Sequence, residues 1–426
     1  MFTIRKKIKL PILFELFIFI GIVELLFHFI LKNMGFEAFQ MYPYLRLFNI
    51  LFSFLFLVKK GLFSFKKIST INLKYTQENM LILFWLVATI ICFFIGIFNR
   101  NSVLYLLTDS IYIFYGYFLY RTFCNDSALQ DQLNTELNKR QDLKFAVTIL
   151  IISVVCFALR LVFPNFLLVF TIVYSLHLFN KKEYVLSLLL TVPFWFQILA
   201  TNRSMLMTVG FILFFRVFQN KFTTKSISYF FYIVAFFGIL GYFFLDDLFY
   251  FLYDILPPNA DFKLRMYQLY SILNGSFDWN SPSFLSLKQR FDEADLVIEY
   301  WLSNPINFIF GGGMGATIEG YAFEDASVIS SAILGTSKIH NIHFLPIAFI
   351  FRYGVLGIII FFQLMRITFK YILVIMTTKP SMYTTIMIFQ FCWILYSMPS
   401  ASFLWPNPMF WILIAYLSNT KMKQHA

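Results

Sequence analysis

The sequence predicts an all-α polytopic membrane protein, with about twelve transmembrane helices and one large extracytoplasmic loop between the ninth and the tenth. Three observations predict this class. Apolar residues make up 59% of the 426 residues and charged residues only 13%, whereas a soluble domain carries about 25% charged residues. The 59 Phe are more than a soluble core of this length could bury. Finally, apolar runs recur near the ~20 residues that a helix needs to cross a bilayer.

The apolar runs also predict the domain organisation. Candidate spans lie at residues 10–31, 43–58, 79–98, 102–120, 145–163, 166–180, 183–200, 204–220, 228–253, 342–365, 382–399 and 403–419. The second, sixth and last runs are short or interrupted, so roughly eleven to thirteen spans fit the sequence. We expect helices one to nine in residues 1–253, an extracytoplasmic loop with amphipathic helices in 254–341, and helices ten to twelve with a short tail in 342–426.

Basic residues predict the orientation of the spans. Most of the 34 Lys and Arg lie in short segments that share a side with the N-terminus, such as 5–9, 59–74 and 366–379. Cytoplasmic loops carry such an excess, so we expect both termini in the cytoplasm and the long loop outside. The net charge of +12 is spread over short loops, which argues against a nucleic-acid partner. No inner segment contains a glycine-rich phosphate loop, which argues against an ATP-driven pump.

The long outer loop differs most from the apolar background. We expect one helix near 261–273 and an amphipathic helix at about 287–302 that lies on the membrane interface. The Asn-Pro pair at 304–305 ends the second helix, because the residue before Pro disfavours the helical conformation. A glycine loop follows, formed by Gly311, Gly312, Gly313 and Gly315. Glycines permit tight backbone conformations and close approach to a ligand.

Two histidines stand at the start of the expected tenth helix. His340 and His343 are three residues apart and would share a face of a helix. Gly354 and Gly357 would continue the stripe below His343, so a reactive imidazole would lie at the outer mouth of a tightly packed helix. The alternative is that both His are interfacial polar residues that mark where the membrane begins.

Several charged residues could face the same region. Arg203 lies in a very short outer connection, where it would face a cavity or, alternatively, the outer headgroups. Arg290 lies in the amphipathic segment, and a surface ion pair with nearby carboxylates is its alternative. Within the spans, Asp109 is a functional candidate or a partner in a helix–helix hydrogen bond. Arg352 could pair with a carboxylate inside the bundle.

Three blocks of sequence occur in one order. The first is Thr201-Asn202-Arg203-Ser204. The second runs from Arg290 and Trp301 through Asn304-Pro305 to Gly311-Gly312-Gly313-Met314-Gly315. The third is His340-Asn341, or His343, followed by Gly354-Val355-Leu356-Gly357. Together the blocks resemble the O-antigen ligase and O-antigen (capsular) polysaccharide polymerase superfamily of bacterial membrane glycosyltransferases. The family's His-to-Gly spacing matches His343, whereas its His-Asn pair matches His340.

The resemblance implies a GT-C-like fold and a metal-independent, inverting transfer of glycan from an undecaprenyl diphosphate carrier, without a cofactor. It places the enzyme in the bacterial cytoplasmic (inner) membrane with the active site on the outer face. Membrane lipid, a chain-length regulator and a flippase are its implied partners. Site residues follow from the matching positions: Arg203 and Arg290 at the diphosphate, Gly311, Gly313 and Asn341 at the substrate, and His343 or His340 at the acceptor hydroxyl.

Physical chemistry agrees with these implied roles. Arginine binds phosphate oxygens in a bidentate manner, and a neutral His suits proton removal. Our first expectation is a polysaccharide polymerase that joins lipid-linked repeat units of a capsule, exopolysaccharide or O-antigen. A ligase that moves a finished chain onto a lipid core or a protein is the alternative with the same chemistry. A lipid-glycan flippase or transporter is the alternative of another class, which would favour internal repeats or charges at mid-membrane.

Overall fold

The structure is a computed structural model of the 426-residue chain. The structure describes residues 10–35, 38–62, 76–124, 136–197, 203–219, 245–255, 261–276, 284–319, 338–399 and 404–418, and also the single residues Tyr232, Phe236, Asp278 and Ser281.

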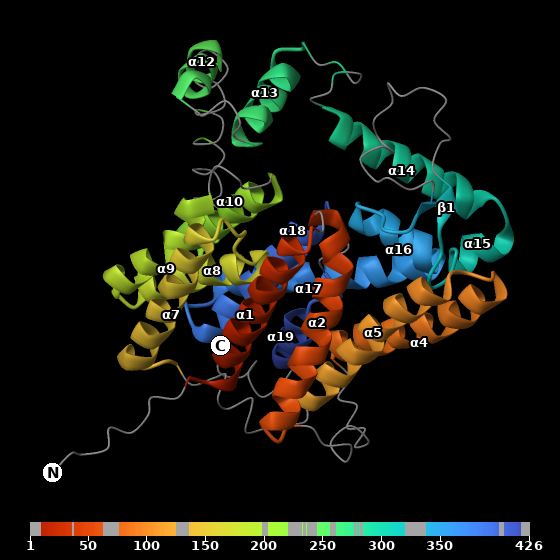
Figure 1. The fold of residues 1–426 in the computed structure, drawn as a ribbon, viewed down its shortest axis with the longest axis horizontal. Coiled ribbons are helices and arrows are strands. Elements are labelled where there is room, and N and C mark those ends of the chain that lie inside the picture. Colours follow the sequence, from red (N-terminus) through yellow and green to blue (C-terminus); the bar gives the residue numbers. More distant parts are fainter. Residues whose placement is uncertain are drawn as a thin grey trace.

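Helices make up most of the described chain (Figure 1). They are α1 (Ile12–Asn33), α2 (Ala38–Lys59), α4 (Gln77–Phe98), α5 (Val103–Cys124), α7 (Lys139–Ala158), α8 (Asn165–Asn180), α9 (Tyr184–Gln197), α10 (Arg203–Phe218), α12 (Leu245–Ile255), α13 (Asp261–Leu273), α14 (Leu285–Leu302), α15 (Pro305–Phe310), α16 (Leu345–Tyr353), α17 (Val355–Thr377), α18 (Met382–Ser397) and α19 (Pro408–Ser418). Two short strands, β1 (Ile318–Glu319) and β2 (Lys338–Ile339), pair in the antiparallel direction.

Several helices are suited to a bilayer. Among the described residues, five helices are long and apolar enough to cross a membrane: α1, α4, α5, α7 and α17. Shorter apolar helices are α8, α9, α18, α19 and most of α10. The chain is therefore an all-α membrane protein, as its composition predicts.

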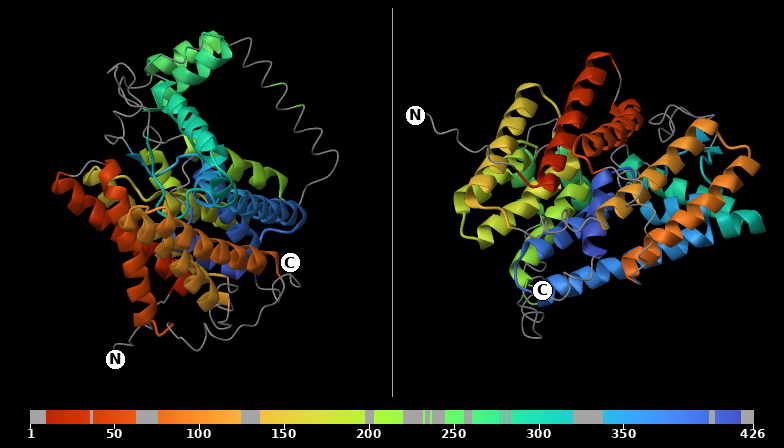
Figure 2. Two further views of the ribbon diagram at one scale, coloured as in Figure 1. Left: turned by 90° about the vertical axis from the view of Figure 1, so that its right-hand side faces the viewer. Right: turned by 90° about the horizontal axis from the view of Figure 1, so that it is seen from below.

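The C-terminal helices α18 and α19 form the centre of the molecule. Every residue of α19 is buried, and so is nearly all of α18. A helix that is apolar on all sides is typical of the interior of a bundle. Helix α19 packs against α5, α4 and α2, whereas α18 packs against α10, α8 and α17. Figures 1 and 2 show the paired helices α4 and α5 along one side of this centre.

Side-chain caps determine where three of the helices begin. Thr76 accepts a hydrogen bond from a backbone N–H in the first turn of α4. Asn138 with Gln141, and Ser381 with Thr384, form reciprocal capping boxes at the starts of α7 and α18. Each cap satisfies N–H groups that have no partner within the helix. These starts can be read directly from the local sequence.

The expectation of one continuous helix at 342–365 is wrong. The chain forms α16 and α17 instead, and the two helices meet at Gly354. Gly354 has a φ of +58°, which L side chains disfavour, and the break allows α16 and α17 to pack against each other. His343 precedes α16, so the expected stripe of His343, Gly354 and Gly357 along one helix face does not exist.

The segment 254–341, expected outside the membrane, contains helices where the sequence predicts them. Helices α13 and α14 match the two expected helices, and α15 follows directly after Asn304, whose side chain caps it. Figures 1 and 2 show α12 and α13 away from the main bundle. The expected ninth span, 228–253, lies mostly outside the described residues, apart from the part that belongs to α12 and two isolated positions.

Candidate functional site

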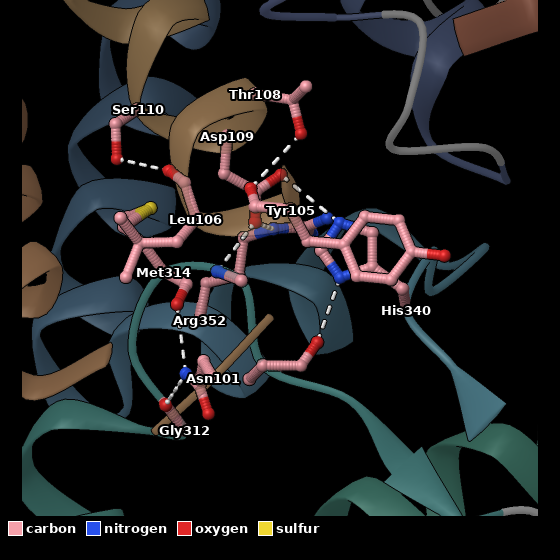
Figure 3. Close-up of polar contacts among 12 residues, drawn as sticks. Asn101, Tyr105, Leu106, Thr108, Asp109, Ser110, Gly312, Met314, His340 and Arg352 are labelled. Carbon is pink, nitrogen blue, oxygen red and sulfur yellow. Dashed lines mark hydrogen bonds and ion pairs between the residues drawn. The ribbon is translucent and has the colours of Figure 1, made fainter. Parts of the chain in front are cut away.

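A buried carboxylate, Asp109 on α5, organises a cluster of polar groups (Figure 3). Its Oδ2 accepts hydrogen bonds from Arg352 Nε and from the Gly315 backbone N–H, both at 3.1 Å. Its Oδ1 lies 3.4 Å from His340 Nε2. Burial of a carboxylate is costly unless opposite charge and hydrogen bonds compensate it, and three separate segments provide both here. The intramembrane partner expected for Arg352 is therefore Asp109.

Both ring nitrogens of His340 face oxygen acceptors. Nδ1 lies 2.8 Å from the carbonyl oxygen of Ala316, and Nε2 faces Asp109. An imidazole can donate to both acceptors only when both nitrogens carry hydrogen. The Tyr105 ring stacks on the imidazole, with 4.1 Å between the ring centroids and 8° between the planes. These contacts fix the position of the His340 ring at the end of β2.

The glycine loop holds a backbone donor against the carboxylate. Asn101 Nδ2 donates to the carbonyl oxygens of Gly312 and Met314, both at 2.8 Å (Figure 3). Gly315 follows directly, and its N–H reaches Asp109. The loop is thus part of the structure that builds the buried cluster.

The glycines of this loop approach the protein's own helices. A Cβ on Gly311 would lie 2.6 Å from the carbonyl oxygen of Phe351 on α16. One on Gly313 would lie 2.8 Å from the carbonyl oxygen of Cys92 on α4. Both glycines also have positive φ, so each is required by backbone conformation and by packing. Close packing on α4 and α16 accounts for them, and contact of Gly311 and Gly313 with substrate stays a prediction.

A cavity of about 510 Å³ opens beside Asp109. Its polar lining consists of Arg46, Thr108, Asp109, His340, Asn341 and Arg352. Four aromatic side chains also line it: Tyr44, Tyr105, Tyr112 and Trp405. The size lies within the roughly 300–1,000 Å³ of small-molecule sites. Two predicted site residues, His340 and Asn341, therefore lie at one cavity.

The charges that line this cavity favour an anion. Two guanidinium groups, those of Arg46 and Arg352, line the cavity together with a single carboxylate, that of Asp109. Glu24 of α1 also attracts Arg46, although Glu24 is not part of the lining. The hydrogen bond from Arg352 to Asp109 uses Nε, so the two terminal nitrogens of its guanidinium group can still donate. Phosphate oxygens are suitable acceptors for such groups.

His343 has a different environment from His340. Its Nδ1 lies 3.0 Å from both carboxylate oxygens of Glu293 on α14, and its backbone N–H donates to Glu293 Oε2 at 3.2 Å. The Glu293 side chain is 2% exposed and that of His343 is 31% exposed. With hydrogen on Nδ1, the neutral ring keeps a lone pair on Nε2. A buried carboxylate that orients a partly exposed imidazole is the arrangement expected of a general base.

The two histidine clusters are neighbours. His343 is three positions after His340, so their α-carbons lie at most about 11 Å apart. One cluster holds the Arg352 guanidinium group at a cavity, and the other supplies an oriented imidazole. The sequence left open which His acts, and the structure gives each a distinct environment.

The two arginines predicted at the diphosphate are placed differently from each other. Arg290 lies on α14 three residues before Glu293, on the same face of that helix, and is not part of the cavity lining. Arg203 begins α10, and its side chain lies outside the described residues. Helices α10 and α14 are apart in Figure 1. Among the described side chains, Arg46 and Arg352 are the guanidinium groups that line the cavity.

Sequence reasoning missed two residues of this site. Arg46 lies in the expected second span, and an intramembrane Arg is itself a signal of function that could have identified it. Glu293 belongs to a charged amphipathic helix, where a carboxylate is expected on the surface. Its burial depends on the packing of α14 against α16 and has no signal in the local sequence.

No family model, curated protein or solved structure matches this chain in comparisons with known proteins. In the part of the chain that the structure describes, no three His, Cys, Asp or Glu side chains are grouped to hold a metal ion. The chemistry of the site must therefore be inferred from its own geometry.

Proposed function

We propose that this protein is a membrane glycosyltransferase of the polysaccharide polymerase type. It would transfer glycan from an undecaprenyl-diphosphate-linked donor to the hydroxyl of a lipid-linked repeat unit. The observation that carries this proposal is the cavity in which Arg46, Arg352 and His340 share one space with four aromatic rings. Cationic groups suit a diphosphate, aromatic faces suit sugar rings, and apolar helices suit a prenyl chain. The resemblance of three sequence blocks to the polymerase and ligase superfamily adds support.

The cavity would act on the leaving group. Negative charge develops on the diphosphate as the bond between its oxygen and the anomeric carbon breaks. Guanidinium groups that are already positioned stabilise this charge more in the transition state than in the ground state. Arg352 is held by Asp109, so its position is fixed before substrate binds. Arg290 and Arg203 remain further candidates for contact with the diphosphate.

His343 would act on the acceptor. The acceptor hydroxyl oxygen forms the new bond to the anomeric carbon with inversion, and its proton passes to His343 Nε2. The diphosphate leaves on its lipid carrier with the electron pair of the broken bond. Glu293 holds the Nδ1 hydrogen and stabilises the imidazolium that forms. No metal ion takes part in this scheme.

The proposal includes the membrane arrangement expected from the sequence. This arrangement has about twelve spans, both termini in the cytoplasm, and the loop 254–341 with the active site on the outer face of a bacterial cytoplasmic membrane. A prenyl-linked donor needs a site that is reached from the bilayer. Aromatic and apolar side chains beside the charged groups of the cavity are consistent with such a site.

The test is polymer formation by purified protein in liposomes that contain lipid-linked repeat units as the sole substrate. We expect polymer from the wild type and a fall in kcat/KM of about 10²–10³-fold for Arg46→Ala, the loss typical of one electrostatic donor. Arg140→Ala is the matched control, because Arg140 is exposed at the start of α7 and does not line the cavity. Its activity should stay within about twofold of the wild type.

Three results would count against the proposal. Normal polymer from Arg46→Ala would exclude the cavity as the diphosphate site. Transfer only to a lipid core or a protein would instead identify a ligase. Movement of lipid-linked repeats across the bilayer without new glycosidic bonds would identify a flippase.

A further inference from the structure

A second cavity, of about 470 Å³, lies among the ends of α7, α8 and α9 and the first turn of α10. The described residues that line it are all different from those that line the cavity at Asp109. Buried apolar side chains form much of its wall, among them Leu161, Phe163, Leu168 and Met205. The first two follow α7, whereas the others come from α8 and α10, so the cavity exists only where these helices meet.

The rim of this cavity is apolar and exposed. Phe157 is 66% exposed, Val162 55% and Phe196 46%. The rings of Phe157 and Phe196 stack with 5.0 Å between their centroids, which joins α7 to α9 at the rim. Exposed apolar groups of this extent mark a surface that contacts another apolar phase. In an all-α membrane protein, that phase is the lipid chains.

Among the described residues, one charged side chain lines the cavity, that of Arg160. Arg160 follows the last turn of α7 with a φ of +52°, an uncommon conformation for a residue other than glycine. Its backbone N–H donates to the carbonyl oxygen of Phe157 at 3.2 Å, and its own carbonyl accepts from Lys32 Nζ at 3.3 Å. The amide side chains of Asn165 and Gln197 add polar groups, and the lining residues that the structure describes include no Asp or Glu. The described lining therefore places a positive charge beside an apolar groove.

We propose that this cavity binds an anionic phospholipid of the surrounding membrane. The phosphate would accept hydrogen bonds from the Arg160 guanidinium group, and the Asn165 and Gln197 amides would donate to the remaining oxygens. One acyl chain would lie in the apolar groove and contact Phe157, Val162 and Phe196. A soluble anion would satisfy the arginine but would leave the exposed apolar rim without a partner. The lipid site does not depend on the reaction proposed for the cavity at Asp109.

The test is native mass spectrometry of the full-length protein in detergent with phosphatidylglycerol or phosphatidylcholine as probe. Two variants act on different parts of the site: Arg160→Gln removes the charge, and Val162→Trp fills the rim. The matched control is Arg100→Gln, because Arg100 is also an exposed arginine with positive φ after a helix, yet it lines neither cavity. We expect occupancy of the first phosphatidylglycerol adduct to fall at least about threefold in both variants and to stay unchanged in the control.

Several outcomes would overturn the proposal. These are equal occupancy in wild type, Arg160→Gln and Val162→Trp, or an equal loss in Arg100→Gln. Equal retention of phosphatidylcholine and phosphatidylglycerol by the wild type would exclude recognition of an anionic lipid. Displacement of phosphatidylglycerol by inorganic phosphate alone would identify a soluble-anion site. Val162→Trp leaves the arginine in place. Its phosphatidylglycerol occupancy therefore tests the lipid site even if Arg160→Gln fails to fold.

Discussion

Asp109 shows at the level of single residues how the site is held together. A buried carboxylate loses its hydration, and the penalty is offset only when opposite charge and well-placed donors replace the water. Asp109 obtains an arginine, a backbone N–H and a histidine, each from a different segment. The same interactions position Arg352 and His340 at the cavity. One side chain thus links the stability of the bundle to the geometry of the proposed diphosphate site.

Glu293 gives a test of the proposed base. Glu293→Gln removes the negative charge beside His343, so the imidazolium that forms when Nε2 takes the proton loses its compensating charge. Proton transfer to Nε2 would therefore be less favourable. We expect kcat to fall by about 10²–10⁴-fold while KM stays within about twofold, because the cavity itself is unchanged. Steady-state polymer formation measures both constants.

The control for this variant is Glu299→Gln, since Glu299 is exposed on the same helix. It should leave kcat unchanged. A rise in KM at constant kcat for Glu293→Gln would contradict the role of a positioning residue for a base and would indicate a role in binding.

At the scale of elements, the corner between α15, α16 and α17 determines where the site lies. Gly311 ends α15 and Gly354 separates α16 from α17, and both have positive φ. The N–H of Gly312 donates to the carbonyl oxygen of Phe351 at 2.8 Å, which fastens the glycine loop to α16. The break between α16 and α17 therefore provides the surface on which the glycine loop packs. The loop in turn places the Gly315 N–H within hydrogen-bond distance of Asp109.

We predict that Gly354→Ala destabilises this corner. A Cβ at Gly354 would lie 2.5 Å from the Gly311 nitrogen and 2.6 Å from the Phe308 carbonyl oxygen, and the sparsely populated backbone conformation at φ +58° and ψ −132° adds about 1–3 kcal/mol of strain. A lower midpoint of thermal unfolding in detergent is the expected result. The control is Gly210→Ala in the interior of α10, where nothing lies within 4 Å of the new Cβ. That variant should be stabilised by about 0.5–1 kcal/mol. An unchanged midpoint for Gly354→Ala would refute the role of the break.

For the whole molecule, a buried centre of α18 and α19 gathers helices from both halves of the chain. Polar links between helices accompany this packing. Lys370 Nζ of α17 donates to Glu78 of α4 at 3.2 Å, and Asn49 of α2 donates to Glu24 of α1 at 3.4 Å. In a bilayer, close packing and such polar contacts hold helices together, because lipid chains are as apolar as the side chains. The charged clusters of the site are therefore also structural.

The expected orientation of the molecule can be tested with single added cysteines. Arg100 and Lys182 are exposed residues in short connections, on opposite sides of the membrane in the arrangement that the basic residues predict. A membrane-impermeant maleimide should label Arg100→Cys in intact cells and Lys182→Cys only after permeabilisation. The native cysteines are buried or half-buried, so the unmodified protein is a suitable blank. The reverse labelling pattern would place the termini outside the cytoplasm.

The sequence also predicted parts of the site, but not the full set of residues that form it. The helix α14, the end of that helix at Asn304, and the pairing of Arg352 with an internal carboxylate agree with the structure. The continuous helix through Gly354 was an error, because a run of apolar residues does not show where two helices meet. Arg46 and Glu293 were missed because their roles depend on contacts with other helices.

The sequence by itself determined that this chain is an all-α membrane protein, because the partition of apolar residues into a bilayer depends on local composition and length. Tertiary structure decided which charged groups meet and which histidine faces which carboxylate. Asp109 is 243 positions from Arg352 and 206 from Gly315. Hydrophobic patterning contains no information about such distant pairs, which form only when the packing of whole helices brings their side chains together.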